Sequence, residues 1–324
     1  MKRQEEIYDR MTGCLYGQAV GDALGLCSEF KSKHETAECF SPMRRYYSQF
    51  YPSGLGVWQD DDTKQMLCLL EELTANGRIE AVSLAARLLN WLETDGFGCG
   101  NLVYQVLTHR DYLNSPFDVA KERWELSGRE AAPNGAIMRT SVIGLWRDNV
   151  ENNAVTACKV THADPRCIGS SVIVSLVINN LVWHGRELSY DEIVRIADGY
   201  DPRIGEWIAM AKNGTLEDLR LDEPHSIGYT LKTLACALWC YWHSPSFEDG
   251  LLAVVNEGGD ADTNAAVACA ILGAKFGYNS IPPYYIENLY NEKDYRAKCE
   301  AFVRLAMGEG LIELNEINYY ESEI

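Results

Sequence analysis

The chain has 324 residues, of which 47% are hydrophobic and 23% charged, a composition typical of a globular protein and not of a disordered or fibrous one. Its 47 Asp and Glu residues outnumber 29 Lys and Arg residues, and the net charge of −18 argues against bulk binding of nucleic acid or anionic membrane. The 11 cysteines lie mostly in apolar runs without the paired spacing of a zinc site, which predicts a reducing, cytoplasmic location.

The N-terminal segment combines polar residues with a glycine repeat. It lacks the apolar stretch of a signal peptide, and we find no apolar run near the roughly 20 residues that span a bilayer, so we expect no membrane association. Glycine then recurs at every fourth position, at Gly17, Gly21 and Gly25, which predicts a helix with one smooth face for close packing. Glu29 follows where this helix would end, and by itself it reads as an ordinary surface charge.

The first acidic motif spans residues 58–63 and contains Asp60, Asp61, Asp62 and Thr63. It precedes an apolar helical run over residues 63–75 that ends at an Asn-Gly pair, typical of a C-cap. A helix N-cap needs only one carboxylate. Two carboxylates about 4 Å apart repel by roughly 4 kcal/mol at an effective dielectric near 20, so three of them in a cleft favour a bound cation.

The middle of the chain combines glycine-rich turns with helix starts. Gly98 and Gly100 alternate in a loop that would let backbone approach a ligand. A turn and a helix start precede Arg139. A helix N-terminus with a nearby guanidinium suits a phosphate, although Arg139 could equally belong to a structural ion pair. His162 precedes another helix start, and no His-x-x-His or Glu-x-x-His pair indicates zinc or di-iron.

Helical signals dominate the remainder. Residues 227–242 and 265–276 are predicted to be buried helices, and period-2 strands, linkers and repeats are absent from the sequence. The sequence therefore predicts an all-α fold in a single compact domain over residues 1–324, with a tail of uncertain order from about residue 313. Further helix starts are predicted at Ser115-Pro116, Asp164-Pro165, Ser189 and Ser246.

The second acidic motif, residues 258–263, repeats the Asp-Thr ending of the first. If the fold joins the two motifs, their hard oxygen ligands suit one or two divalent cations of the Mg²⁺ or Mn²⁺ type. The alternative is that each motif is merely an over-supplied helix cap. The candidate ligands are Asp60, Asp61, Asp62, Asp260, Asp262 and Thr263.

Taken in order, these segments resemble the ADP-ribosylglycohydrolase family, the group that includes dinitrogenase-reductase-activating glycohydrolase and the J1 crystallins. The resemblance spans about residues 13 to 283 and follows the family's order. The matching stretches are residues 17–29, 58–66, 96–100, 134–139, 161–162, 227–229 and 258–263, continuing through Gly273, Gly277 and residues 281–282.

The resemblance implies an orthogonal all-α fold, a binuclear Mg²⁺ (or Mn²⁺) centre, and hydrolysis of the bond between C1″ of ADP-ribose and an acceptor on a protein or small molecule. Glu29, Asp61 and Asp262 would take catalytic roles, Glu29 near the scissile bond. The implied metal ligands are Asp61, Asp62, Asp260, Asp262 and Thr263. The ADP-ribose pocket would contain Gly98, Gly100, Asn134, Gly135, Arg139, His162, Ile227, Gly228 and Tyr229.

Two departures from the family pattern affect these expectations. Asp60 stands where the family usually has Thr or Ser, so it either replaces a hydroxyl ligand or points away. Residues 131–133 are Ala-Ala-Pro in place of the usual small or aromatic residues and Gly, which alters the expected pocket wall.

Other functions stay open at this stage. One is a non-catalytic ADP-ribose binder or a J1-crystallin-like structural protein, which retention of both acidic motifs disfavours. Another is an Asp-rich, Mg²⁺-dependent diphosphate enzyme of the isoprenoid-synthase type, which would need Asp pairs one helical turn apart. The acceptor and the oligomeric state are left open; arginine, serine, an acetyl ester, another ADP-ribose unit and a nucleobase all fit as acceptors.

Overall fold

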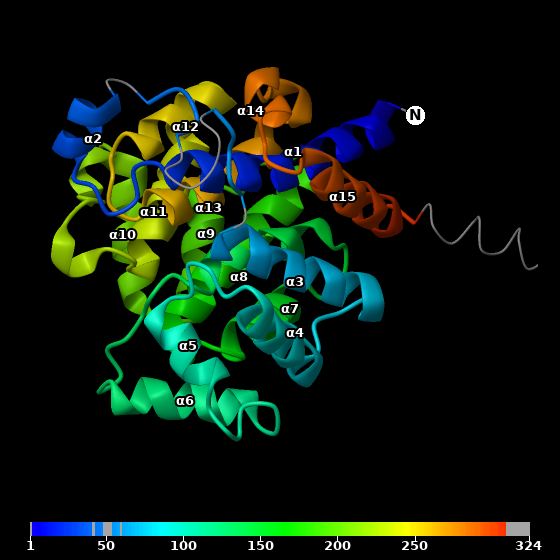
Figure 1. Cartoon of the computed structure of the whole chain (residues 1–324), viewed down its shortest axis with the longest axis vertical. Helices are drawn as coiled ribbons and strands as arrows, with labels where there is room; N and C mark the ends of the chain where they lie inside the picture. Colours follow the sequence, from blue (N-terminus) through cyan, green and yellow to red (C-terminus); the bar gives the residue numbers. More distant parts are fainter. Residues whose placement is uncertain (1, 41–42, 48–53, 59, 309–324) are drawn as a thin grey trace, which may run out of the picture.

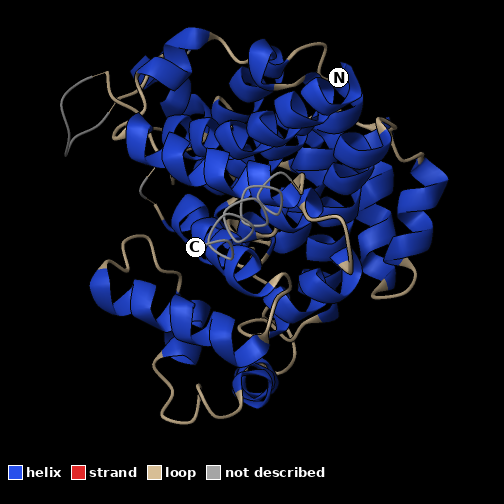
Figure 2. Cartoon of the chain, turned by 90° about the vertical axis from the view of Figure 1, so that its right-hand side faces the viewer, coloured by secondary structure: helices blue, strands red, loops and turns tan. Residues whose placement is uncertain are grey.

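The structure, a computed structural model, describes residues 2–40, 43–47, 54–58 and 60–308. Within these ranges helices are the only regular elements, as Figure 2 shows, and β-type pairing is limited to two isolated bridges. The all-α prediction is confirmed. The α-helices are α1 (Lys2–Gly25), α2 (Lys33–Phe40), α3 (Asp61–Asn76), α4 (Ala81–Thr94), α5 (Asn101–Leu107), α6 (Pro116–Leu126), α7 (Val150–Lys159), α8 (Pro165–Asn179), α9 (Tyr190–Ala197), α10 (Pro202–Asn213), α11 (Thr230–His243), α12 (Phe247–Val255), α13 (Ala261–Phe276), α14 (Pro283–Glu287) and α15 (Glu292–Ala306).

Short 3₁₀ turns and one π turn join these helices. The predicted tail from about residue 313 lies outside the described residues. Figure 1 shows α13 in the middle of the molecule and α5 and α6 at its lower edge. The short turns are η1 (Ile137–Arg139), η2 (Ser141–Leu145), η3 (Asn180–His184), η4 (Glu217–Leu219), η5 (Pro224–Ser226) and η6 (Tyr278–Ser280).

The glycine face of α1 packs directly against the backbone of α13. A Cβ atom built on Gly17 would lie 2.1 Å from the carbonyl oxygen of Cys269, far inside van der Waals contact. Gly21 faces Ala265 and Gly25 faces Ala261 in the same way, at 2.2 and 2.4 Å. Because the α13 partners descend by four as the α1 positions ascend, the helices are antiparallel. The C-terminus of α1, from which the chain continues to Glu29, therefore lies beside the N-terminus of α13, as Figure 1 illustrates.

The helix starts predicted from capping residues form where expected. Asp164 and Ser246 each accept a backbone N–H of the following turn, and Ser189 forms a complete capping box with Glu192. Helix α3 ends at Asn76 with Gly77 in the left-handed conformation. Helix α6 begins at Pro116 as predicted, although the Ser115 side chain makes no capping bond.

One prediction about apolar length is wrong. Helix α8 continues into η3, and residues 165–184 form one helical stretch that is long and apolar enough to cross a membrane by length and composition. In the most apolar window of this stretch, 78% is buried inside the protein, as in the core helix of a globular fold. Ser170, Ser171 and Ser175 interrupt this apolar run in the sequence, but in the structure all three side chains are buried, and the Ser175 hydroxyl bonds to backbone carbonyls.

Candidate active site

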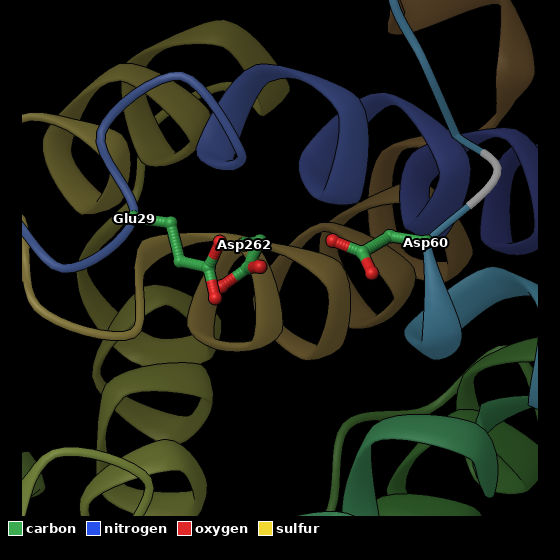
Figure 3. A group of neighbouring side chains, drawn as sticks. All are labelled: Glu29, Asp60 and Asp262. Atoms are coloured by element: carbon green, nitrogen blue, oxygen red, sulfur yellow. The ribbon is translucent and has the colours of Figure 1, made fainter. Parts of the chain in front are cut away.

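Three carboxylates from distant segments converge at the junction of α1, α3 and α13. Glu29 comes from the loop after α1, Asp60 from the N-cap of α3 and Asp262 from the first turn of α13. One oxygen of each lies within 4.8 Å of the others. Figure 3 shows Glu29 and Asp262 side by side, with Asp60 pointing toward them from α3. Of the two orientations left open for Asp60, the structure has the one directed into the cluster.

The first acidic motif is anchored by a residue of α1. Asp60 is the N-cap residue of α3, and its side chain accepts the backbone N–H of Asp61, the first residue of the helix, at 2.8 Å. Two residues on, Thr63 donates its backbone N–H to Asp22 Oδ2 at 3.1 Å and its hydroxyl to the same oxygen. Asp22 and Asp62 are fully buried, and each keeps one carboxylate oxygen without a hydrogen-bond partner.

The second motif reaches across to other segments. Asp260 Oδ2 accepts a bond from Asn134 Nδ2 at 2.6 Å, and Thr263 donates its hydroxyl to Asp62 Oδ2 at 3.3 Å. The Thr263–Asp62 bond joins the two motifs directly, across about two hundred residues of sequence.

The loop before α13 is also tied to the loop that carries Glu29. Phe30 donates its backbone N–H to the Gly259 carbonyl at 2.7 Å, and Gly259 donates in turn to the Lys31 carbonyl at 2.7 Å. The position of Glu29 relative to α13 is therefore fixed by backbone bonds on both of its C-terminal neighbours.

Burial and mutual repulsion raise the pKa values of these carboxyls. Burial, followed by the charges of Asp60 and Asp260, raises the pKa of Glu29 to about 8. Burial is also the main reason that the pKa of Asp60 rises to about 6, and burial raises the pKa values of Asp61, Asp62 and Asp262 well above the ordinary range.

The cluster has no basic partner in direct contact. The ion pairs between described residues include none of its carboxylates. A buried acidic cluster of this kind is stabilised either by protonation or by a bound cation.

The donor set fits a hard divalent cation. All of the side chains offer oxygen, and the unpartnered oxygens of Asp22 and Asp62 show that protein donors alone leave the cluster unsatisfied. Gly98 leaves room beside it: with φ at +77°, a Cβ atom there would lie 2.0 Å from Asp60 Oδ1 and 3.0 Å from Asp61 Oδ1.

A cavity of about 650 Å³ opens beside the cluster. This volume is within the usual range of small-molecule sites. Glu29, Asp61, Asp260, Asp262 and Thr263 line one side of it. Of the predicted pocket residues, the structure brings Gly98, Gly100, Asn134, Gly135, His162, Ile227, Gly228 and Tyr229 to the wall.

Backbone hydrogen bonds hold together two segments that line the cavity. The segment before Asn134, including the Ala-Ala-Pro departure, pairs with the segment around Tyr229 through bonds from Asn134 N to Gly228 O and from Thr230 N to Ala132 O. Arg166 donates to the Tyr229 hydroxyl at 3.3 Å and is held by Asp164.

Arg139 is placed differently from the expectation. Its side chain is fully buried and does not line the cavity; it donates to Gln65, to the Ala157 carbonyl and to Thr161. The predicted place of Arg139 in the ligand pocket is therefore wrong. Its guanidinium has a structural role, as the alternative interpretation of the sequence allowed. The sequence pattern did not reveal this because a helix start followed by Arg occurs in both settings.

Sequence reasoning also missed Asp22 as part of the site. The signal was present, since Asp22 is the only acidic residue within the glycine-spaced segment, on a helix that packs by close contact. Phe30, Met138 and His225 also line the cavity without having been predicted.

Comparison with known proteins agrees with this geometry. The model of the ADP-ribosylglycohydrolase family matches residues 3–315. An uncharacterized protein of Archaeoglobus fulgidus is 30% identical over 87% of this chain and 92% of its own length. The ADP-ribosylarginine hydrolase Tri1 of Serratia proteamaculans is 26% identical over 94% of this chain and 82% of its own.

A solved structure is similar throughout as well. It is titled an ADP-ribosylglycohydrolase-related protein complex and superposes with a TM-score of 0.66 at 24% identity, covering 93% of this chain and 99% of that one. At this identity the superposition shows the fold. With the family model matching nearly the whole length, the chain belongs to the ADP-ribosylglycohydrolase family, whose members are hydrolases acting on glycosyl-type bonds.

Proposed function

We propose that this hydrolase uses Mg²⁺ or Mn²⁺ to cleave the C1″ bond between ADP-ribose and an acceptor on a protein or small molecule, releasing ADP-ribose. The observation that carries the proposal is the convergence of Glu29, Asp60 and Asp262 next to a cavity that Glu29 and Asp262 line and that is large enough for a nucleotide-sized ligand. An Asp-rich diphosphate enzyme would need a second kind of aspartate-rich helical turn, and family membership removes the reason to invoke one.

The candidate metal ligands are Asp60, Asp61, Asp62, Asp260, Asp262 and Thr263, with Asp60 in the place of a hydroxyl. When bound there, the cation would supply Lewis acidity and neutralise the carboxylates. Of these residues, Asp62 and Thr263 are already hydrogen-bonded to each other, so the two motifs are pre-assembled from the protein's own contacts. Such preorganisation is what a metal site requires of its surroundings.

Glu29 is suited to proton transfer at the scissile bond. Its carboxyl lines the cavity, and one of its oxygens lies within 4.8 Å of oxygens of Asp60 and Asp262. Cleavage of a ribosyl bond develops oxocarbenium character, and the leaving group needs a proton. Asp61 and Asp262 line the same side and would orient the reacting groups.

Few basic residues are needed to hold the diphosphate. Backbone around Gly98, Gly100 and Gly135 forms part of the wall, and glycine allows a ligand to approach backbone N–H donors closely. This accords with a chain of strongly negative net charge.

The first experiment measures release of free ADP-ribose from a panel of conjugates with Mg²⁺, with Mn²⁺ and with EDTA. The panel holds ADP-ribosyl-arginine, ADP-ribosyl-serine, O-acetyl-ADP-ribose and poly(ADP-ribose). Because the Serratia relative is an ADP-ribosylarginine hydrolase, the arginine conjugate is the first to test. We expect metal-dependent release from at least one member. Release that is unaffected by EDTA would contradict the metal dependence.

A second experiment does not depend on the acceptor. ADP-ribose at a hundredfold excess over Kd should stabilise the folded protein by about 2.7 kcal/mol. For a chain of this length that raises Tm by several degrees, since ~1 kcal/mol shifts domains of 150–250 residues by roughly 2–4 °C. The shift should require Mg²⁺ or Mn²⁺ and shrink with EDTA, and AMP should reproduce only part of it.

The matched control for this shift compares two Asp→Asn variants. Asp262→Asn should reduce the ADP-ribose shift, whereas Asp198→Asn, at an exposed helix end, should retain it. An unmoved melting curve with millimolar ADP-ribose and Mg²⁺ would instead favour a J1-crystallin-like structural protein.

A further inference from the structure

A continuous chain of hydrogen bonds runs from Asp61, at the acidic cluster, to His162. Asp61 Oδ2 accepts from Gln65 Nε2 at 3.2 Å, and Gln65 Oε1 accepts from Arg139 at 2.6 Å. Arg139 also donates to Thr161 Oγ1 at 2.5 Å, and this oxygen lies 2.8 Å from His162 Nδ1. Gln65, Arg139 and Thr161 are fully buried.

The guanidinium of Arg139 fixes the direction of every bond in this chain. A guanidinium donates and never accepts, so the Gln65 oxygen must face Arg139. The amide nitrogen of Gln65 then has to face Asp61, where it donates to the carboxylate. One permanently charged group thus determines the orientation of a side chain that contacts a candidate metal ligand.

The same reasoning fixes the protons on the other side. Thr161 Oγ1 accepts from Arg139, and its hydroxyl proton has one remaining acceptor among its contacts, His162 Nδ1. The reverse arrangement, with Nδ1 protonated, would leave that buried hydroxyl proton without an acceptor, at a cost in stability. His162 Nδ1 is therefore the acceptor, and in a neutral ring the proton is on Nε2.

His162 Nε2 is the open end of the chain. It is buried and has no hydrogen-bond partner among the described residues. The ring lines the cavity beside Gly135, where a Cβ atom would lie 3.3 Å from Cε1 and 3.5 Å from Nε2. Burial and the nearby Arg139 charge lower the pKa of His162 to about 3, which keeps the ring neutral. An unpartnered buried donor on a residue that lines a cavity points to a ligand atom that accepts.

We propose that Gln65, Arg139 and Thr161 are positioning residues that connect Asp61 to His162 and hold His162 as a neutral Nε2–H donor to an acceptor atom of the ligand. The identity of the ligand as ADP-ribose rests on the proposed function. The tautomer of the His162 ring does not depend on the proposed function, so an experiment can contradict the tautomer and the ligand assignment separately.

The test is NMR of the full chain labelled with ¹⁵N-histidine, recorded without ligand. The chain has six histidines, and His162→Gln assigns the His162 signals by their loss. We expect Nδ1 of His162 to show the shift of an unprotonated ring nitrogen and Nε2 that of an N–H, unchanged between pH 5 and 8. A ring protonated on Nδ1, or on both nitrogens, in the wild-type protein would overturn the proposal without any variant.

Two substitutions at position 161 test the relay. Thr161→Val removes the hydroxyl at constant shape and should abolish the single Nε2–H tautomer, whereas Thr161→Ser should restore it. Thr36→Val is the matched control. The Thr36 side chain, in α2, is buried to the same extent as Thr161, but its hydroxyl has no hydrogen-bond partner among the described residues. A fixed Nε2–H tautomer in Thr161→Val would show that the hydroxyl does not set it.

Measurements of ADP-ribose binding test the proposed contact between His162 Nε2 and the ligand. Loss of one aligned hydrogen bond should raise the Kd for ADP-ribose in Thr161→Val by roughly five- to tenfold, with Thr161→Ser close to wild type. Hydrolysis should show a raised KM and a smaller change in kcat. If the wild-type tautomer is as expected and Kd is unchanged in Thr161→Val, the proposed contact with the ligand is wrong. If wild-type protein binds no ADP-ribose, the proposed function fails while the ring assignment holds.

Discussion

The N-termini of α3 and α13 carry related Asp-Thr sequences but are held in different ways. Asp60 caps its own helix, whereas Asp260 makes no capping bond and is held by Asn134. Thr63 turns back to Asp22 on α1, whereas Thr263 crosses to Asp62 in the other motif. Thr63 thus ties its helix to a carboxylate of α1, and Thr263 joins the two acidic motifs. Equal motifs need not contribute equally to stability and function.

The largest effect is expected from the carboxylates themselves. Asp61→Asn and Asp262→Asn should each reduce hydrolysis to background and sharply weaken Mg²⁺ or Mn²⁺ binding. Neither should destabilise the metal-free fold, because a repulsive cluster loses one charge. Activity assays, metal titration calorimetry and melting curves in EDTA measure the three outcomes. Full activity in either variant would remove that residue from the centre.

Glu29 lies outside both acidic motifs, and we expect it to act in proton transfer and not as a metal ligand. Glu29→Gln keeps the shape of the side chain and removes its proton-transfer capacity, so kcat should fall by at least ~10² while metal affinity is largely kept. Steady-state kinetics on the best conjugate, with metal binding measured in parallel, separates the two quantities. An unchanged kcat would make Glu29 a bystander.

The threonines test the contrast directly. Thr63→Val removes a buried bond to Asp22 and should cost about 1–3 kcal/mol of unfolding free energy. Thr263→Val removes a longer bond, 3.3 Å, and should cost less than about 1 kcal/mol while weakening metal binding more. Urea unfolding in EDTA, followed by metal titration, gives both numbers. Equal stability losses in the two variants would show that the helix starts are not differentiated as described.

The smallest effect is a pH dependence of stability. The folded state raises the pKa of Glu29 from 4.5 to about 8 and that of Asp60 from 3.8 to about 6. Between the ordinary and the raised pKa values, the folded protein therefore binds more protons than the unfolded chain. The stability that this proton binding contributes is present at low pH and is lost as pH rises through the raised pKa values. In EDTA, Tm should fall by a few degrees between pH 5 and 8, and saturating Mg²⁺ should reduce the fall. Asp60→Asn should flatten the metal-free profile; a metal-free Tm that rises over this range would contradict the prediction.

Much of the site could be anticipated because its chemistry is local in sequence. Asp60 and Asp62 are recognisable in the sequence as part of a run of carboxylates, and Gly98 as a glycine of a glycine-rich loop. The all-α fold follows from periodicity and caps that act over a few residues. Bonds between distant segments leave no such pattern. Nothing near Gln65 in the sequence indicates that it contacts both Asp61 and Arg139. Asp22 stands out as the one acidic residue of the glycine-spaced segment, but the sequence does not show that its partner is Thr63.

The contact between α1 and α13 also limits how this enzyme can be engineered or can diverge. Replacing glycine by alanine inside a helix is a common route to greater thermal stability, worth roughly 0.5–1 kcal/mol. At Gly17 and Gly21 that route is closed, because a methyl group would meet the opposing main chain of α13. Gly205 in α10 faces open space and tolerates the same change. Sequence drift in this chain is thus restricted by backbone spacing far from the reacting atoms, at positions that touch neither metal nor substrate.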